Sequence, residues 1–187
     1  MVEQLNDVNV LKIKELDQAV RQNPASSKAT MKVSSSWHRG TKTIVEVGSF
    51  EVGGQSFFPP TRKFLLMIEE PELMGGVDSA PTPIETAVAA LAGCLSNGIA
   101  TNAALFDVPL DRIDIEIEAD IDFKGFLGHD KSVRSGISDI RYTVTIQSPA
   151  PEDKVRRCKE TLDRKSAVRD TLANPVNITS KFVYKPS

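Results

Sequence analysis

Alternating apolar and polar residues predict β-strands in both halves of the chain. The clearest case is 113–122, where an isoleucine or alanine at every second position alternates with aspartate or glutamate. A period of two predicts a long strand with one buried face and one solvated, acidic face. Shorter alternating or apolar segments predict further strands at 31–37, 43–50, 64–68, 140–146 and 176–182. The turn-like residues 38–42 would join the first two of these into a hairpin.

Helical periodicity marks three further segments. Residues 10–20 place five apolar side chains on one stripe, and Asn23-Pro24 ends the pattern. We therefore assign residues 1–27 to an N-terminal helical extension and residues 28–187 to the main domain. Helices are also expected at 151–162, where acidic residues occupy the first turn, and in a short piece at 166–172.

The longest helix predicted has no polar face. It runs from about Thr82 to about Phe106, with Pro83 in its first turn, and most of its side chains are apolar and small. A helix that is apolar on all sides belongs in the centre of a fold. One three-stranded sheet cannot cover all of its sides, so a second sheet or a second copy of the chain must shield the rest. We expect a homodimer on this ground.

The order of the elements gives the fold class. Three strands precede the central helix, two strands follow it, and a helix and a last strand close the chain. Strands that come in runs, without regular alternation with helices, predict an α+β fold with antiparallel sheets wrapped around the long buried helix.

Composition removes several classes of function. The chain has 187 residues, with 23 basic and 25 acidic residues and a net charge of −2, so we expect neither nucleic acid nor a membrane as a partner. We expect no apolar run long enough to span a bilayer, and no secretory signal is visible, so the expected location is cytoplasmic. The two histidines and two cysteines lack paired ligand spacing, so no metal and no cofactor are expected.

Four segments together resemble the OsmC-like family, which includes the organic hydroperoxide resistance proteins. They are 70–83 (EPELMGGVDSAPTP), 90–94 (ALAGC), 122–128 (DFKGFLG) and 170–176 (DTLANPV), and the resemblance extends over about 28–184. It implies an intertwined homodimer in which two central helices are wrapped by sheets from both chains. It also implies cysteine-based, thiol-dependent reduction of organic hydroperoxides, as part of an oxidative stress response.

The resemblance assigns the reactive cysteine to Cys94, within the central helix. It also implies an arginine from the N-terminal hairpin turn that stabilises the thiolate, for which Arg39 is the candidate by position and Arg62 a weaker one. A thiolate is the reactive form, and apolar burial disfavours it unless a nearby cation such as Arg39 reverses the effect. The alternative for Cys94 is a small buried residue in a tight helix pair.

Two positions depart from the family pattern. Ile84 follows Pro83 where the peroxidases have a glutamate, and the nearest acid is Glu85, which could equally be a first-turn residue favoured by the helix dipole. Ser166 stands where the resolving cysteine is expected, so oxygen replaces sulfur, and a capping role is its alternative. The second cysteine, Cys158, is eight residues from that position, roughly 12 Å along a continuous helix, and is an unsuitable substitute.

Two functions therefore remain. The first is a peroxidase in which Cys94 works in a one-cysteine cycle with an external thiol reductant, supported by Arg39, Glu85 and Ser166. The second is a dimer on the same scaffold that binds a small apolar or acyl ligand without turnover.

Overall fold

The computed structural model describes residues 4–56 and 61–186. The strands are β1 (Gln4–Leu5), β2 (Val8–Asn9), β3 (Ala29–Arg39), β4 (Lys42–Val52), β5 (Gln55–Ser56), β6 (Phe64–Ile68), β7 (Arg112–Asp120) and β8 (Asp139–Gln147). The α-helices are α1 (Val10–Gln22), α2 (Pro83–Leu105), α3 (Phe123–Phe126), α4 (Glu152–Asp163) and α5 (Ala167–Ala173). Two short 3₁₀ turns, Pro24–Ser27 and Glu72–Met74, complete the order. The chain is α+β, as the pattern of residues predicts.

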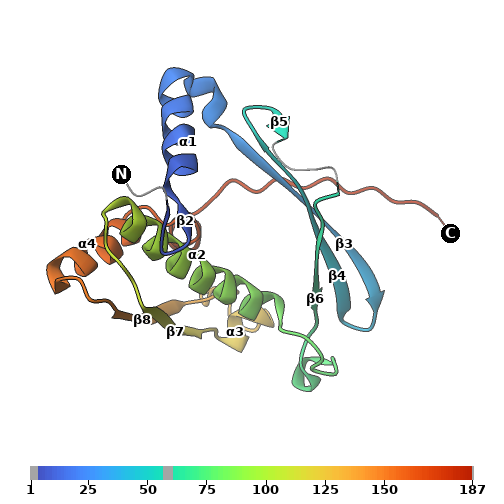
Figure 1. The fold of residues 1–187 in the computed structure, drawn as a ribbon. Helices are drawn as coiled ribbons and strands as arrows, with labels where there is room; N and C mark the ends of the chain where they lie inside the picture. Colours follow the sequence, from blue (N-terminus) through green and yellow to red (C-terminus); the bar gives the residue numbers. More distant parts are fainter. Residues whose placement is uncertain (1–3, 57–60, 187) are drawn as a thin grey trace.

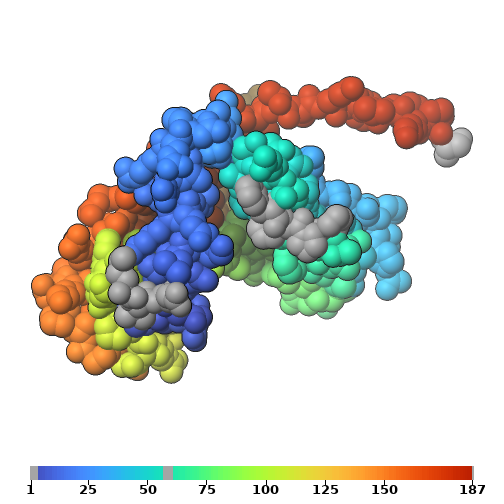
Figure 2. All heavy atoms as spheres, turned by 45° about the horizontal axis from the view of Figure 1, so that its top comes forward, coloured from blue at the N-terminus to red at the C-terminus, as the bar shows by residue number. Residues whose placement is uncertain are grey.

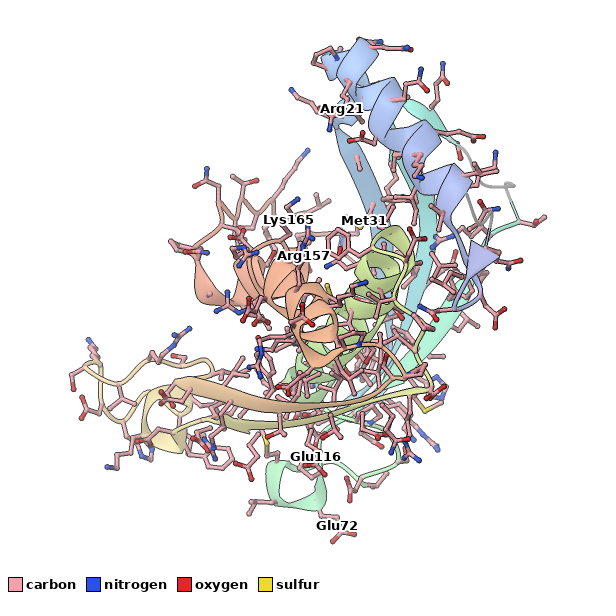
Figure 3. All side chains as sticks on the ribbon, turned by 60° about the vertical axis from the view of Figure 1, so that its left-hand side comes forward. Arg21, Met31, Glu72, Glu116, Arg157 and Lys165 are labelled. Carbon is pink, nitrogen blue, oxygen red and sulfur yellow. The ribbon has the colours of Figure 1, made fainter. Side chains whose placement is uncertain are left out.

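The core lies between α2 and the antiparallel β7–β8 hairpin (Figure 1). The inward residues of the hairpin pair with one another, from Ile113 opposite Ile146 to Ala119 opposite Ile140. They pack against three fully buried residues of α2, namely Leu91, Leu95 and Ile99. The acidic residues between the isoleucines lie on the outer face, and Figure 3 shows Glu116 on the side away from α2. The period-two pattern therefore predicted both faces of this strand correctly.

Helix α2 begins at a complete capping box. The Thr82 hydroxyl accepts a hydrogen bond from the Glu85 backbone N–H at 3.1 Å, and the Glu85 carboxylate accepts one from the Thr82 N–H at 2.8 Å. Two N–H groups that the first turn leaves unpaired are thus satisfied, with Pro83 in the position where no N–H is needed. The predicted start and end of this helix are confirmed.

The middle of α2 approaches α4 closely at Gly98. An added Cβ at Gly98 would stand 2.2 Å from a methyl carbon of Leu162, which is itself only 6% exposed. Towards the end of α2, Ala103 packs with Val108 and the buried Cys158 of α4. The small residues of α2 thus allow α4 to lie against it.

A second sheet lies on the other side of α2 from the β7–β8 hairpin (Figure 1). Strand β4 is at its centre and pairs antiparallel with β3, β5 and β6. Within the single chain this sheet leaves large apolar side chains exposed on β3 and β6. They are Met31, Val33, Trp37, Phe64, Leu65, Leu66 and Met67.

A buried carboxylate ties the second sheet to the segment that leads into α2. Glu69 is 4% exposed, and its Oε2 accepts hydrogen bonds from the backbone N–H and the hydroxyl of Ser79, with Lys42 Nζ at 3.6 Å. The hydrogen bonds from Ser79 are the main cause that lowers the pKa of Glu69. The carboxylate is therefore held ionised, and it fixes the loop that precedes Thr82.

The N-terminal segment folds against the end of α2. The side chain of Asn6 donates to the carbonyl of Val108 at 3.0 Å and accepts from the N–H of Leu110 at 2.9 Å. Helix α1 then rises away from this anchor (Figure 1). The predicted helix is confirmed, although its boundary with the main domain stays a prediction.

Two expectations need correction. Residues 176–182 do not form a strand, because nothing among the described residues pairs with them, and Figure 2 shows this tail as an arm that projects from the rest. Ile178 and Phe182 on the tail are 86% and 87% exposed. In addition, by length and composition α2 qualifies as a helix able to cross a membrane, a test that core helices also pass.

The contact between Gly98 and Leu162 generates a prediction on stability. Gly98→Ala should lower the free energy of unfolding by about 1–2 kcal/mol, because overpacking a filled core outweighs the roughly 1 kcal/mol that alanine gains within a helix. In a Leu162→Ala background, the same change should be neutral or stabilising. Urea unfolding of the four proteins measures this. An equal cost in both backgrounds would show that the two residues do not limit the approach of the helices.

Candidate active site

The candidate site is built from the middle of α2 and the start of α5. Cys94 Sγ lies 3.3 Å from Ser166 Oγ. Ser166 is 3% exposed, whereas Cys94 is only partly buried. The structure thus brings together the two residues that the resemblance pairs, at a point that a small molecule can reach.

Ser166 is held in place by its role as the N-cap of α5. Its Oγ accepts a hydrogen bond from the Arg169 backbone N–H at 3.2 Å. Because the oxygen is then the acceptor in that bond, the hydroxyl hydrogen is available to Cys94 Sγ. Ser166 therefore both caps α5 and contacts the thiol, two roles that the sequence presents as alternatives.

Cys158 occupies a different environment from Cys94. It is fully buried on α4, and its Sγ donates to the Lys154 carbonyl at 3.3 Å. Burial is the main cause that raises the pKa of its thiol. Both cysteines are free thiols, and the Cys158 thiol has the features of an inert core residue.

The two arginine candidates lie at the end of β3 and just before β6. Arg39 ends β3 beside the hairpin turn and is exposed, and no hydrogen bond or ion pair among the described residues joins it to Cys94. Arg62 donates to the Gly48 carbonyl, and its guanidinium stacks on the ring of Phe64 at 4.9 Å. These contacts hold the Arg62 guanidinium against β4 and β6.

The residues at the start of α2 have separate surroundings. The Glu85 carboxylate is occupied in the capping box, nine residues before Cys94, or roughly 13 Å along the helix. Ten residues are about 2.8 helical turns, so Ile84 points roughly 80° around α2 from Cys94. Its side chain lines a cavity of about 460 Å³ between α2, α5 and β8.

Sequence reasoning missed this cavity. Its walls include Ile84 of α2, Tyr142 of β8 and Arg169 of α5, which are distant from one another in sequence, and Arg134 from the loop that leads into β8. The Tyr142 hydroxyl donates to Asp163 Oδ1 at 2.8 Å, and burial is the main cause that raises the pKa of this tyrosine. The feature of the sequence that could have pointed to this cavity is Tyr142, an aromatic residue with a polar end on the inward side of a predicted strand.

Comparison with known proteins identifies the family. A sequence profile of the OsmC-like protein family matches residues 76–181, more than half of the chain. No curated protein matches the chain.

Solved structures share the fold at low identity. They include an OsmC-like protein from Mycoplasma pneumoniae, with 11% identity, a TM-score of 0.58, and coverage of 77% of this chain and 87% of that chain. An OsmC-like protein from Vibrio cholerae has 12% identity, a TM-score of 0.54 and coverages of 76% and 92%. An organic hydroperoxide resistance protein OsmC from Legionella pneumophila has 14% identity, a TM-score of 0.51 and coverages of 76% and 88%. By the match to its sequence profile, this chain belongs to the OsmC-like protein family.

Proposed function

We propose that the protein is a thiol-dependent hydroperoxide reductase with a role in oxidative stress, and that Cys94 is its nucleophile. The observation that carries the proposal is the 3.3 Å contact between Cys94 Sγ and Ser166 Oγ. A hydroxyl that donates to sulfur favours the thiolate over the thiol, as any hydrogen bond to the charged form does. The family membership and the Legionella pneumophila relative described as an organic hydroperoxide resistance protein support this choice.

The reaction begins with attack of the Cys94 thiolate on the terminal oxygen of a hydroperoxide, ROOH. The O–O bond breaks, the sulfur becomes a sulfenic acid, and the alkoxide leaves as the alcohol ROH after it takes up a proton. An external thiol then condenses with the sulfenic acid to give a mixed disulfide and water. A second external thiol then attacks the mixed disulfide and releases Cys94 as a thiol, so the two external thiols leave as a disulfide and have supplied both electrons.

Ser166 cannot take part as a resolving residue, because an alcohol oxygen does not form a disulfide. The sulfenic acid therefore persists until an external thiol arrives, and the cycle needs only one cysteine of the protein. We propose Ser166 as a supporting residue that donates to the sulfur. Glu85 contributes by holding the start of α2 through its capping box.

We further propose that the active form is a homodimer. Small or polar side chains of α2 that the chain leaves exposed lie on one stripe, which comprises Ala89, Ala90, Gly93 and Asn97. Only 28% of the most apolar part of α2 is buried. The exposed apolar residues of β3, β6 and the tail add to this stripe, and exposed apolar surface of this kind is typical of an interface with another protein chain.

The homodimer also provides a source for the cation. Because no hydrogen bond or ion pair among the described residues joins Arg39 to Cys94, we propose that Arg39 reaches the thiolate from the second copy of the chain. An arginine in that place would stabilise the thiolate by charge as well as by hydrogen bonds.

A second function is favoured by the cavity beside Ile84. The cavity falls within the size range of small-molecule sites, so the protein could instead bind an apolar or acyl ligand without turnover. In that case Cys94 would react slowly with alkylating reagents. Alkylation of Cys94 by iodoacetamide at pH 7, compared with free cysteine, separates the two functions, because a catalytic thiolate reacts faster.

The role of Cys94 is tested by its replacement. Cys94→Ser should lower the consumption of cumene hydroperoxide by a factor on the order of 10³, because an alcohol is not a comparable nucleophile at neutral pH. The assay uses dithiothreitol or a monothiol as reductant, and Cys158→Ser serves as the matched control that keeps the rate. Equal rates for wild type and Cys94→Ser would rule out the peroxidase.

The position of Ser166 is tested by restoring sulfur. Ser166→Cys should form a disulfide with Cys94 after one equivalent of peroxide, because the present Sγ and Oγ atoms are already in contact. A count of free thiols and the mass of the intact chain measure the bond. The matched control is Ser96→Cys, whose hydroxyl now bonds to Ala92 O on α2 and which should keep its thiol free. A Ser166→Cys protein that retains all its thiols would contradict the geometry.

The homodimer is tested on the exposed stripe of α2. In the single chain an added Cβ at Gly93 meets no atom within 4 Å, so Gly93→Leu would leave an isolated chain intact. In a dimer that packs along this stripe, the leucine should weaken association by at least about tenfold. Sedimentation velocity measures the mass, with Gln18→Leu on the exposed face of α1 as control. A wild-type monomer, or a dimer that Gly93→Leu leaves unchanged, would contradict this interface.

A further inference from the structure

The cavity beside Ile84 has an apolar wall and a charged rim. The wall is formed by Ile84, Ala87 and Leu91 of α2 and by Leu172 of α5. From Ile84 to Leu91 the helix rises by about 10 Å, so the apolar wall is long enough for an alkyl chain of medium length. The volume of about 460 Å³ agrees with a ligand of that size.

The rim carries more positive than negative charge. Two guanidinium groups, of Arg134 and Arg169, and one carboxylate, of Asp139, line the cavity. Arg169 is tethered by a hydrogen bond from Nη1 to the Asp163 carbonyl at 3.1 Å. The side chain of Arg134 has no hydrogen bond or ion pair with any described residue. Arg134 is therefore the donor that a ligand can engage.

We infer that this cavity binds an amphipathic monocarboxylic acid, with its alkyl chain along α2 and its carboxylate on Arg134. The planar guanidinium matches the two oxygens of a carboxylate, and a charge-assisted pair of hydrogen bonds is stronger than a neutral one. The net charge of the lining favours an anion over a cation. The three residues of the α2 wall favour an alkyl chain over a polar group.

Ile84 is the residue that makes this site specific to the present chain. Helix α2 would present a carboxylate to the cavity if position 84 carried the glutamate of the related peroxidases. That carboxylate would repel a bound acid and would pair with the free arginine. The isoleucine instead leaves Arg134 unpaired and extends the apolar wall by one helical turn.

The site is separate from the thiol. Cys94 does not line the cavity, and the neighbouring Leu91 is only 1% exposed. The inference therefore holds whether or not Cys94 reduces peroxides. It also does not require the second copy of the chain, because one chain supplies the wall and the rim.

Calorimetric titration of the full chain with octanoate tests the inference. We expect one octanoate per chain, with octan-1-ol binding at least about tenfold more weakly because it lacks the charge. Arg134→Gln and Ile84→Glu should each weaken octanoate binding by about 10- to 100-fold. Arg21→Gln removes an exposed charge on α1 and is the matched control, and Cys94→Ser should bind like the wild type.

The site is supported if Arg134→Gln and Ile84→Glu lose affinity for octanoate while their circular dichroism stays that of the wild type. The Arg21→Gln control should keep the wild-type affinity. Equal affinity for octanoate and octan-1-ol, or equal affinity in Arg134→Gln and Arg21→Gln, overturns it. If Arg134→Gln fails to fold, the octanoate affinity of Ile84→Glu decides the question: a loss supports the site, and the wild-type affinity overturns it. Absence of any octanoate binding to the wild type also overturns it, and leaves the proposed peroxidase untouched.

Discussion

The fold depends on one constraint, which is that α2 must be covered although it has almost no polar side chains. The β7–β8 hairpin covers one side through Leu91, Leu95 and Ile99, and α4 covers another because position 98 has no side chain. The stripe around Gly93 remains open in the single chain. The proposed nucleophile, Cys94, thus lies in the middle of a helix that is covered on two sides, where its position is held more rigidly than in a loop.

The same constraint separates the two cysteines. Cys158 faces α2 from α4 and is sealed within the second apolar cluster, where burial raises its pKa. Cys94 is at the border between the covered and the open sides of α2, with a hydroxyl beside it. The difference in environment therefore follows from which neighbour covers each position. It does not follow from the local sequence, because Cys158 has two adjacent arginines and Cys94 has none.

The periodicity of apolar residues and the residues that begin and end helices made much of the fold predictable. The isoleucine alternation of β7, the apolar segment of β6 and the proline at the start of α2 are local signals, and the structure confirms each of them. The tail at 176–182 alternates equally well and forms no strand, because a strand also needs an edge to pair with and the pattern does not say whether one is present. The contact of Cys94 with Ser166 was accessible only through the family resemblance. The cavity beside Ile84 was not predicted at all, because its walls come from three separate parts of the chain.

The two departures from the family pattern act at different places on α2. Ile84 lines the cavity near the start of the helix, whereas Ser166 contacts the Cys94 sulfur. Without an acid at position 84, α2 presents no carboxylate from that position to the two arginines that line the cavity. Without sulfur at position 166, the oxidised thiol has no intramolecular partner. In the proposed reductase, Ser166 is the polar contact that the chain itself supplies to the Cys94 sulfur, and the electrons that reduce the oxidised sulfur come from a separate thiol.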